Sequence, residues 1–349
     1  MHDLASKLKF LQSPQAFGDS ALQVEALETH MSWVFLVGEQ VFKLKKPVRF
    51  PFLDFATMAS REYYCREELR LNARLAPGVY RGLMALQWRD GVFSLVPESR
   101  LQANPDPSSE TVDWLVWMRR VPQVRMLDHL ILHKQLSTDD VDAVTNVMST
   151  FYRQAPIVEV NPDDYLSRFQ YEQASTREVL LRPQFQLLDV AQAIDRLDTA
   201  LAIGAELLRE RARQQRVLDG HGDLRPEHIC LLQPPVVIDC LEFNPQLRQV
   251  DPFDELAYLA LECAVAGASW VGERLLQGCA AALHDHPAPA LIQVYTAHRA
   301  LLRARLAMAH LLDSTPRTPT KWAPQATCYI DHALAALDAF DSIYRSQLK

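Results

Sequence analysis

Cysteine pairs with metal-binding or redox spacing are absent from this chain. None of its six cysteines forms a C-x-x-C motif; they are Cys65, Cys230, Cys240, Cys263, Cys279 and Cys328. The sequence therefore indicates neither a zinc ribbon nor a dithiol redox centre, and we expect buried, reduced thiols. The N-terminal residues lack the basic region and apolar run of a signal peptide, and no charge-free apolar stretch of about 18 residues occurs. These absences predict a cytoplasmic protein that does not span a membrane.

A surplus of basic residues is also absent. Lysine and arginine number 36 against 43 aspartates and glutamates, which gives a formal net charge of −7. Dedicated nucleic-acid binders usually carry a basic surplus, so the sequence predicts no nucleic-acid partner. With 48% hydrophobic and 23% charged residues, the 349-residue chain has a globular composition and is long enough for a two-lobed unit or two domains.

The sequence motifs of three common enzyme classes are missing. No G-x-x-x-x-G-K-[ST] occurs, which excludes a P-loop kinase. Neither G-x-S-x-G nor H-E-x-x-H occurs, which argues against an α/β-hydrolase and a zinc protease.

The hydrophobic pattern changes near residue 120. Before this point, the sequence predicts strands at 21–27, 32–37, 40–44, 79–88, 92–96 and 112–118, one helix at 58–75, and loops at 52–58 and 97–110. After it, long helices are predicted at 138–153, 163–180, 186–216, 252–283, 288–312 and 325–346, with short strands at 228–232 and 236–241. The prediction is an α+β protein with a β-rich N-terminal lobe, residues 1–120, and a mostly helical C-terminal lobe, residues 121–349.

The polar stretch HGDLRPEH at 221–228 lies between a predicted helix and a predicted strand. Phosphoryl transfer to a hydroxyl needs a carboxylate that orients the nucleophile and accepts its proton, with a metal ligand nearby. Asp223 and His228 have the spacing of the pattern H-x-D-x-x-x-x-N, apart from its last residue. We expect His221 to brace this loop. The alternative is an ordinary polar turn with an aspartate cap.

Asp239 lies in an apolar strand, eleven residues after His228. A buried aspartate is costly unless it is paired or bound to a metal ion. A hairpin formed by 228–232 and 236–241 would return Asp239 beside Asp223, and carboxylate oxygens suit Mg²⁺. The sequence therefore predicts a metal site at Asp239, whereas the alternative is an aspartate that caps a turn.

A lysine-containing apolar strand, VFKLKKP, occupies 41–47. Strand alternation places Lys43 and Lys45 on one face and Phe42 and Leu44 on the other. A half-buried lysine in a cleft can bind phosphates as a point charge, and a glutamate of the helix at 58–75 would hold it. The alternative is a solvated basic edge strand.

Together these stretches resemble the aminoglycoside phosphotransferase-like branch of the protein-kinase-like fold, in particular a bacterial group of unassigned substrate. The resemblance covers nearly the whole chain. It rests on VFKLKKP (41–47), REELRLNARLAP (66–77), HGDLRPEHICL (221–231), VIDCLEFN (237–244) and VDPFDELAYLA (250–260). It implies a two-lobed kinase-like fold, ATP as the phosphate donor, Mg²⁺ as the cofactor and a small-molecule acceptor.

The resemblance also implies roles for individual residues. Lys43 corresponds to the lysine that binds the nucleotide phosphates. Glu68 corresponds to the helix glutamate that pairs with this lysine, with Glu67 as the fallback. Asp223 corresponds to the catalytic aspartate and Asp239 to the metal-binding aspartate.

Further positions follow from the same resemblance. Asp251 and Glu255 correspond to residues that brace the catalytic loop. The backbone of 117–121, which includes Met118, corresponds to the adenine-binding segment between the lobes. Acidic residues that are candidates for an acceptor pocket, or equally for solvated helix faces, are Asp163, Asp164, Glu172, Asp254 and Glu262.

Three positions depart from the family pattern. His228 replaces the usual metal-binding asparagine, and an imidazole suits Mn²⁺ better than Mg²⁺; binding through water and a hydrogen bond to Asp223 are alternatives. No G-x-G-x-x-G loop occurs, so the hydroxyls of Thr29 and Ser32 in the first predicted turn are candidates for holding the phosphates. Glu255 replaces the usual aspartate.

The function predicted from these features is an ATP-dependent phosphotransferase that acts on a hydroxyl of a small molecule. Asp223 is its predicted base, and Asp239 and His228 are its predicted metal ligands. The alternative, motivated by His228 and the missing glycine loop, is a nucleotide-binding regulatory protein or pseudokinase. A third hypothesis is transfer from ATP to protein, by phosphorylation or nucleotidylation. The sequence gives no indication of oligomeric state.

Overall fold

The computed structural model describes residues 3–18, 23–50, 53–103, 106–313 and 318–347. The chain divides into two compact units, and each is described by itself. The first unit contains residues 1–125 and 236–247, and the second contains 126–235 and 248–349. The segment 236–247, which carries Asp239, thus belongs to the first unit, whereas the sequence-based division kept it in the second. Within the described ranges, no helix is both long and apolar enough to cross a membrane.

The first unit is built on a six-stranded antiparallel sheet with the strand order β1-β2-β3-β8-β6-β7. Its strands are β1 (Val24–Glu28), β2 (Ser32–Val37), β3 (Gln40–Lys45), β6 (Tyr80–Arg89), β7 (Val92–Pro97) and β8 (Glu110–Arg119). The predicted strands are confirmed, except that residues 21–22 of the first lie outside the described residues. Tight turns with positive φ at Gly38 and Gly91 close two of the hairpins.

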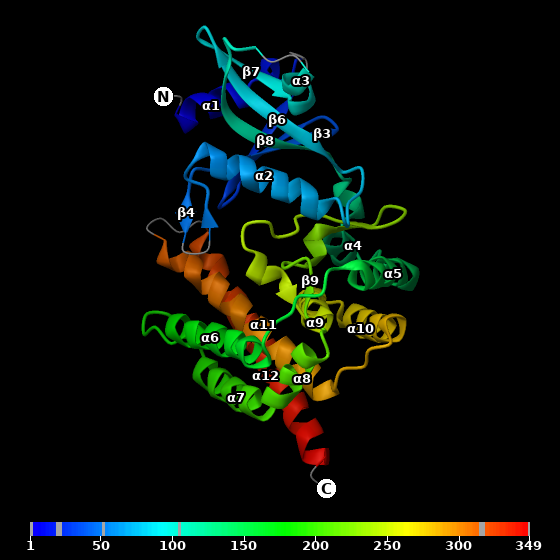
Figure 1. Cartoon of the computed structure of the whole chain (residues 1–349). Coiled ribbons are helices and arrows are strands. Elements are labelled where there is room, and N and C mark those ends of the chain that lie inside the picture. Colours follow the sequence, from blue (N-terminus) through cyan, green and yellow to red (C-terminus); the bar gives the residue numbers. More distant parts are fainter. Residues whose placement is uncertain (1–2, 19–22, 51–52, 104–105, 314–317, 348–349) are drawn as a thin grey trace. The chain divides into compact units, whose positions relative to one another are not determined.

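The two faces of this sheet are covered by different helices. On one face, α1 (Leu4–Leu11) and the 3₁₀ turn η1 (Pro14–Phe17) pack over a core that includes Phe35, Phe42 and Leu44. On the other face, α2 (Met58–Asn72) lies along β8 and β6 and buries Cys65 against a second apolar cluster (Figure 1). Because Phe42 faces the first core, its neighbour Lys43 faces α2.

Two predicted loops of the first unit contain regular structure. The segment 97–110 includes a short helix, α3 (Glu98–Ala103), and a small hairpin of β4 (Arg49–Phe50) and β5 (Leu53–Asp54) precedes α2. These elements are too short to produce a recognisable hydrophobic period, which is why the sequence did not predict them. Residues 51–52 and 104–105 of these segments lie outside the described residues.

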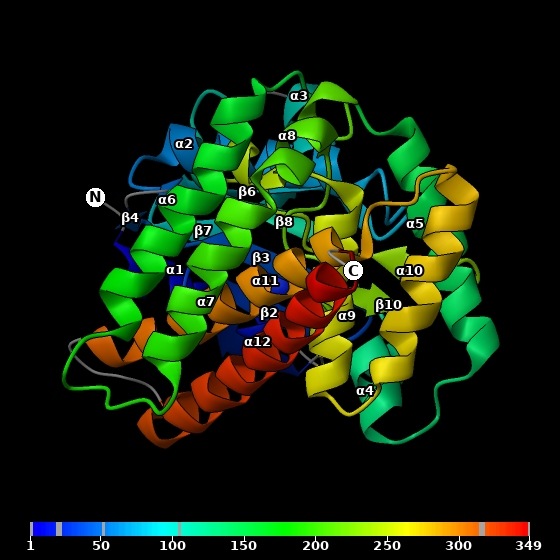
Figure 2. The ribbon, with the colours of Figure 1, turned by 90° about the horizontal axis from the view of Figure 1, so that it is seen from below.

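The second unit is mostly helical. Its helices are α4 (Leu127–Leu132), α5 (Thr138–Gln154), α6 (Pro162–Leu180), α7 (Val190–Ile203), α8 (Ala205–Arg213), α9 (Pro252–Val265), α10 (Ser269–Leu283), α11 (Pro289–Ala309) and α12 (Pro319–Gln347). The long helices α11 and α12 run side by side (Figure 2). The short α4 was not predicted. Helix α12 begins six residues before the predicted start, because Pro324 lies near its beginning and does not end it.

Two long predicted helices are each divided into two. The predicted helix at 186–216 breaks at Gly204 into α7 and α8. The predicted helix at 252–283 ends after α9 at Gly267, which adopts φ +89°, and α10 begins two residues later. Glycine reaches this left-handed conformation without the steric cost of a side chain, so it ends a helix readily. The apolar periodicity continues across both breaks and therefore concealed them.

Short strands frame the loop that carries Asp223. Strand β9 (Leu218–Asp219) pairs with β12 (Gln249–Val250), and α9 begins directly after β12. The loop continues through the 3₁₀ turn η3 (Pro226–His228) into β10 (Ile229–Cys230). Strands β10 and β11 (Val236–Val237) are shorter than predicted, and the 3₁₀ turn η4 (Pro245–Arg248) follows.

Candidate functional site

The first unit brings Lys43, Glu68 and Asp239 together from three elements. Lys43 Nζ on β3 donates to Glu68 Oε1 on α2 at 3.0 Å and to Asp239 Oδ1, in the segment after β11, at 2.8 Å. The Glu68 side chain is 1% exposed, whereas that of Asp239 is 47% exposed. Glu67, the fallback, pairs with Arg70 along the helix. The structure therefore places Glu68, not Glu67, beside Lys43.

A second ion pair, which the sequence did not predict, extends this group into the interior. Lys45 Nζ donates to Glu68 Oε2 at 2.6 Å and also binds Glu242, three residues after Asp239. The Lys45 side chain is fully buried and lies over the Phe55 ring, 5.0 Å from its centroid. The alternation of Lys43 and Lys45 was visible in the sequence. Nothing in the sequence indicated that Glu242 would fold back to meet them.

The charges of this group are strongly coupled. Burial alone would lower the pKa of Lys43, but Asp239 and Glu68 outweigh it and raise that pKa well above its ordinary value. Burial opposes ionisation of Lys45 too, yet Glu242 and Glu68 raise its pKa. Burial would raise the pKa of Glu68, and the two lysines lower it instead. For Glu242, burial outweighs the attraction of Lys45 and raises the pKa of the carboxyl group.

The backbone of Asp239 is held in an unusual conformation. Its φ of 61° lies in the left-handed region, which residues other than glycine seldom adopt. Its N–H donates to the Tyr80 hydroxyl at 3.1 Å, and the next N–H, of Cys240, donates to Asn72 Oδ1 on α2 at 2.9 Å. Such conformations persist where surrounding contacts fix them, and they concentrate at functional sites. The Asp239 carboxylate is thus aimed by its backbone as well as by Lys43.

The turn between β1 and β2 is closed by its own side chains. Thr29 Oγ1 donates to the Ser32 carbonyl and accepts from the Ser32 N–H, both at 2.9 Å. Lys46 Nζ binds Glu28 and the Thr29 carbonyl at 2.5 and 2.6 Å. At the tip of the turn, the His30 ring stacks on Phe50. The Thr29 hydroxyl therefore already forms two hydrogen bonds within the turn. Phosphate binding by Thr29 or Ser32 stays a prediction.

Met118 lies inside β8, where it pairs with Val41 of β3 on one side and Tyr80 of β6 on the other. The next two backbone N–H groups donate to the carbonyls of Val79 and Glu39. Adenine binding by the backbone of 117–121 stays a prediction.

In the second unit, Glu255 of α9 holds the loop that contains Asp223. Its carboxylate accepts the N–H of His221 at 3.0 Å and that of Gly222 at 2.6 Å, and the Tyr152 hydroxyl donates to it at 2.9 Å. A Cβ on Gly220 would lie 3.1 Å from this carboxylate and 2.6 Å from a Val250 methyl group, so only glycine fits there. The bracing role implied for Glu255 matches this geometry.

Asp251 braces a different part of the second unit. It caps α9 by accepting the Phe253 N–H, and it binds the buried Arg211 and the Tyr295 hydroxyl. Arg211 in turn pairs with Asp285 at 2.7 Å. Asp285 is itself buried.

The Asp223 carboxylate is flanked by a guanidinium and a phenol. Arg225 Nη2 lies 3.1 Å from Asp223 Oδ2, and the Tyr258 hydroxyl donates to Asp223 Oδ1 at 3.3 Å. Burial would raise the pKa of Asp223, but His228 and Arg225 outweigh it and lower that pKa. The carboxylate is therefore ionised at neutral pH. No sequence signal had pointed to Tyr258.

His228 uses both ring nitrogens within the same loop. Nδ1 lies 2.7 Å from the Asp223 carbonyl, which only accepts, so Nδ1 carries the proton and donates. Nε2 lies 3.2 Å from Arg225 Nη2, a donor, and therefore accepts. His221 braces the loop as expected, because its Nδ1 accepts the Asp223 N–H at 3.3 Å.

Within the described ranges, no group of three or more His, Cys, Asp or Glu side chains is placed to hold a metal ion. A Mg²⁺ site needs fewer such side chains, because it uses one or two carboxylates and keeps several waters and phosphate oxygens as its other ligands. The half-exposed carboxylate of Asp239 fits this role. Because Asp223 and Asp239 lie in different units, their convergence stays a prediction.

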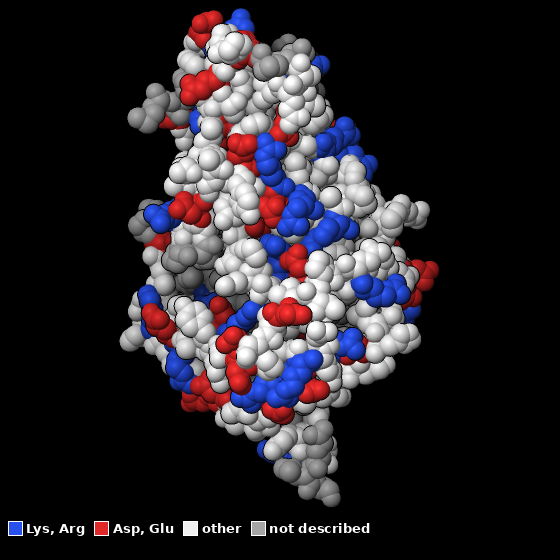
Figure 3. All heavy atoms as spheres, viewed as in Figure 1, with Lys and Arg blue, Asp and Glu red and all other residues white. Residues whose placement is uncertain are grey.

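The acidic candidates for an acceptor pocket are mostly paired with arginines. Buried Asp254 and Glu262 of α9 bind Arg299 and Arg303 of α11, and Glu172 of α6 binds Arg305. Exposed Asp163 binds Arg209. Acidic and basic side chains are likewise interspersed on the surface that Figure 3 shows. Asp254, Glu262 and Glu172 thus already have cationic partners, and a role of the acidic residues in an acceptor pocket stays a prediction.

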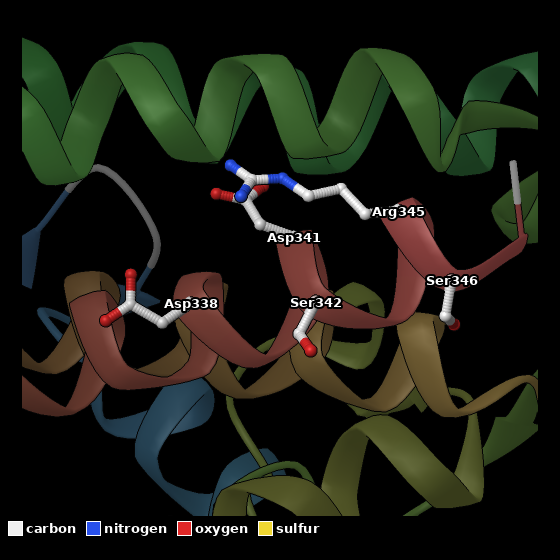
Figure 4. A pocket seen from close by; sticks show the side chains of 5 residues that line it. All are labelled: Asp338, Asp341, Ser342, Arg345 and Ser346. Carbon is white, nitrogen blue, oxygen red and sulfur yellow. The ribbon is translucent and has the colours of Figure 1, made fainter. Parts of the chain in front are cut away.

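Two hollows lie apart from these groups. One, of about 630 Å³, is lined among the described residues by side chains of α12, and Figure 4 shows Asp341 and Arg345 turned toward each other there. Asp338 and Asp341 also pair with Arg196 of α7. The other, of about 410 Å³, lies on the sheet face covered by α1 and η1 and includes Phe42 and Trp117. This is the face opposite Lys43.

Comparison with curated proteins finds relatives that carry no assigned activity. No protein-family model matches the chain. Uncharacterized proteins of Mycobacterium tuberculosis (strain H37Rv) and Mycobacterium bovis are 28% identical over 326 residues, which cover 90% of this chain and 61% of each relative. The chain thus spans about three fifths of the length of the curated relatives it matches.

Comparison with solved structures identifies the fold. The choline kinase LicA from Streptococcus pneumoniae superposes with a TM-score of 0.53 at 11% identity, over 96% of this chain and 99% of that chain. A thermostable mutant of the aminoglycoside phosphotransferase APH(4)-Ia gives 0.51 at 15% identity, over 97% and 98%. A choline kinase from Cryptosporidium parvum gives 0.51 at 8% identity, over 98% and 95%. The chain has the protein-kinase-like fold of these proteins, which confirms the predicted fold class and, at the level of the fold, the resemblance.

Proposed function

We propose that this protein is an ATP-dependent phosphotransferase that acts on a hydroxyl of a small molecule. The observation that carries the proposal is the position of Lys43, which joins Glu68 and Asp239 from three separate elements at 3.0 and 2.8 Å. A lysine held by a helix glutamate beside a metal-binding aspartate is the arrangement with which kinases bind nucleotide phosphates. The shared fold with choline kinases and an aminoglycoside phosphotransferase supports the same proposal.

In this proposal the first unit binds ATP. Lys43 neutralises the α- and β-phosphates, and the Asp239 carboxylate holds Mg²⁺. When bound, Mg²⁺ would neutralise charge on the β- and γ-phosphates. Coordination by His228 would require Arg225 to leave Nε2, so we assign the metal first to Asp239.

Asp223 of the second unit acts as the base. Its lowered pKa keeps it ionised, and Arg225 and Tyr258 fix both of its oxygens. As the acceptor oxygen bonds to the γ-phosphorus, its proton passes to Asp223, and the bond from this phosphorus to the β,γ-bridging oxygen breaks. ADP leaves with the electron pair of that bond. The step requires the two units to bring Asp223 and Asp239 to one nucleotide.

We propose a small-molecule acceptor because choline kinases and an aminoglycoside phosphotransferase share this fold. The arginine pairing of Asp254, Glu262 and Glu172 disfavours a strongly cationic acceptor of the aminoglycoside kind. The curated relatives extend beyond the matched region, so the activity of a longer protein would be a separate proposal.

A second candidate is a nucleotide-binding regulatory protein. It is favoured by the closed turn at Thr29 and by the engagement of both His228 nitrogens. Such a protein would be stabilised by ATP but would not consume it.

The test is ATP consumption with Mg²⁺ or Mn²⁺ across a panel of amino alcohols, amino sugars and nucleosides, with wild-type protein and Asp223→Asn. We expect Asp223→Asn to lower turnover by about 10²–10⁴ while ATP affinity is kept. Wild-type protein that gains thermal stability from ATP yet transfers phosphate to no acceptor would favour the regulatory protein. Equal turnover in the variant would contradict the assignment of Asp223.

A further inference from the structure

Five charged side chains of the first unit form a continuous chain of ion pairs. In order they are Asp239, Lys43, Glu68, Lys45 and Glu242, so negative and positive charges alternate. Both ends lie on one segment, because Glu242 follows Asp239 by three residues. The exposed fraction of the side chains falls from 47% at Asp239 to 16% at Lys43 and to 1% or less at Glu68 and Lys45. One end of the chain therefore meets solvent and the other is buried.

Glu68 occupies the centre of this chain and divides its two oxygens between two lysines. Oε1 accepts from Lys43 and Oε2 from Lys45. A buried carboxylate that loses its only cationic partner is strongly destabilised. If Lys43 were the only partner of Glu68, its movement toward a phosphate would leave a buried, unpaired charge. Because Lys45 remains in place, Glu68 stays compensated when Lys43 moves.

Glu242 lies at the buried end of the ion-pair chain. It binds Lys45, while the intervening Cys240 N–H donates to Asn72 of α2. The segment that carries Asp239 is thereby attached to β3 through Lys45 and to α2 through Asn72, and neither contact involves Lys43. Binding of a metal ion at Asp239 would release Lys43 from that carboxylate without releasing the segment.

We propose that Lys45 and Glu242 are positioning residues that free Lys43 to bind nucleotide phosphate. This inference rests on the proposed ATP site. It assigns the second lysine of VFKLKKP and the glutamate of VIDCLEFN to one buried ion pair, whose role is to hold Glu68 and the Asp239 segment while Lys43 exchanges partners.

The experiment compares the affinities of ATP with Mg²⁺ and of adenosine, measured by titration calorimetry on the full chain. Adenosine has no phosphate and so reports on the remainder of the nucleotide site. In Lys45→Met, Lys43 is the one ion-pair partner of Glu68 that remains among the described residues. We expect the ratio of ATP affinity to adenosine affinity to fall about 10-fold or more, with adenosine affinity within about 3-fold of wild type.

The matched control is Lys7→Met. Lys7 is another buried lysine of the first unit, paired with Asp113 at 2.7 Å and not part of the five-residue chain. This variant should lose stability but keep the wild-type affinity ratio. The double variant Lys45→Met with Glu242→Gln removes the carboxylate left unpaired by the first change. It should regain stability while the affinity ratio stays low, and it carries the test if Lys45→Met does not fold.

An unchanged affinity ratio in the Lys45→Met or double variant would overturn the inference and leave the proposed function intact. Recovery of the ratio together with stability in the double variant would also overturn it, because the pair would then be merely structural. Wild-type protein that binds neither ATP nor adenosine would instead overturn the proposed function, and this inference with it.

Discussion

The two units hold the carboxylates of the proposed site in different ways. In the first, Asp239 and Glu68 are held by side-chain ion pairs with Lys43 and Lys45, across elements far apart in sequence. In the second, the loop around Asp223 is held mainly by backbone N–H groups that donate to Glu255. The first site therefore depends on the balance of buried charge, and the second depends on hydrogen-bond geometry.

This difference has a consequence for ligand binding. Ion pairs can exchange partners when a phosphate or metal ion arrives, since the incoming charges replace those that leave. Backbone amides bound to one carboxylate have no such alternative, so the loop keeps its shape. A kinase-like site needs both properties: mobile charges for the nucleotide and a fixed base for the acceptor.

Removing the central carboxylate of the first unit should have the largest effect. Glu68→Leu leaves two lysines buried near one another, and we expect a loss of about 3–5 kcal/mol in the free energy of unfolding. Denaturant titration measures it. The neighbouring Glu67→Leu removes a surface pair with Arg70 and should cost about 0.5 kcal/mol. Equal effects of the two changes would show that buried charge does not dominate this site.

Replacing the loop brace of the second unit should cost less. Glu255→Gln keeps the size of the side chain but turns one acceptor oxygen into a donor, in a site where the wild-type carboxylate accepts from two backbone N–H groups and a hydroxyl. We expect a loss of about 1–3 kcal/mol in stability, together with reduced turnover. Glu273→Gln, at an exposed position on α10, is the control. Full activity in Glu255→Gln would contradict the role of loop geometry.

Lowering the pH should destabilise the region around His298 in the second unit before the region around Glu68 in the first. Burial, with Arg299 and Arg305, lowers the pKa of His298 in the second unit from 6.5 to about 3. The stability due to its neutral form is present above pH 6.5 and is lost as the pH falls from 6.5 toward 3, by about 1.4 kcal/mol per pH unit. The pKa of Glu68 is lowered from 4.5, so its contribution is lost only below pH 4.5.

Hydrogen exchange at pH 6.5 and 5.0 measures this separation. Amides of α6 and α11 should lose protection between these values, while β3 and α2 change less. His298→Gln should remove the pH dependence of α6 and α11. Equal losses in both regions, or an unchanged dependence in the variant, would contradict the assignment to His298.

The smallest expected effect concerns the hydroxyl that supports Asp223. Tyr258→Phe removes a hydrogen bond of 3.3 Å, worth about 1 kcal/mol. We expect turnover to fall by about 5-fold and the acidic limb of the pH–rate profile to move. Tyr171→Phe, at an exposed position, should change neither. An unmoved profile in Tyr258→Phe would mean that Asp223 does not need this contact.

Much of the first unit follows from its sequence. Alternating apolar residues and a turn glycine predict strands β2 and β3, and helical periodicity predicts helix α2. The same strand alternation places Lys43 and Lys45 on one face. Glu242 could not be predicted, because its contact with Lys45 joins residues 197 positions apart. Long-range ion pairs leave no periodic signal in a single sequence.

In the second unit, spacing identified the loop but not its surroundings. His221, Asp223 and Glu255 fall at the positions that the resemblance implies, and the structure joins the loop to Glu255. Asp251 was expected to brace this loop and instead binds Arg211, since it caps α9 and faces α8. Tyr258 shares α9 with many apolar residues and was indistinguishable from a core tyrosine.

The most direct measurement of the central claim is the effect of Mg²⁺ on ATP affinity in wild-type protein and in Asp239→Asn. The account predicts that Mg²⁺ strengthens ATP binding to the wild type by about 10-fold or more, and that Asp239→Asn binds ATP equally with and without Mg²⁺. A wild type without any magnesium effect, or a variant that keeps all of it, would contradict the account.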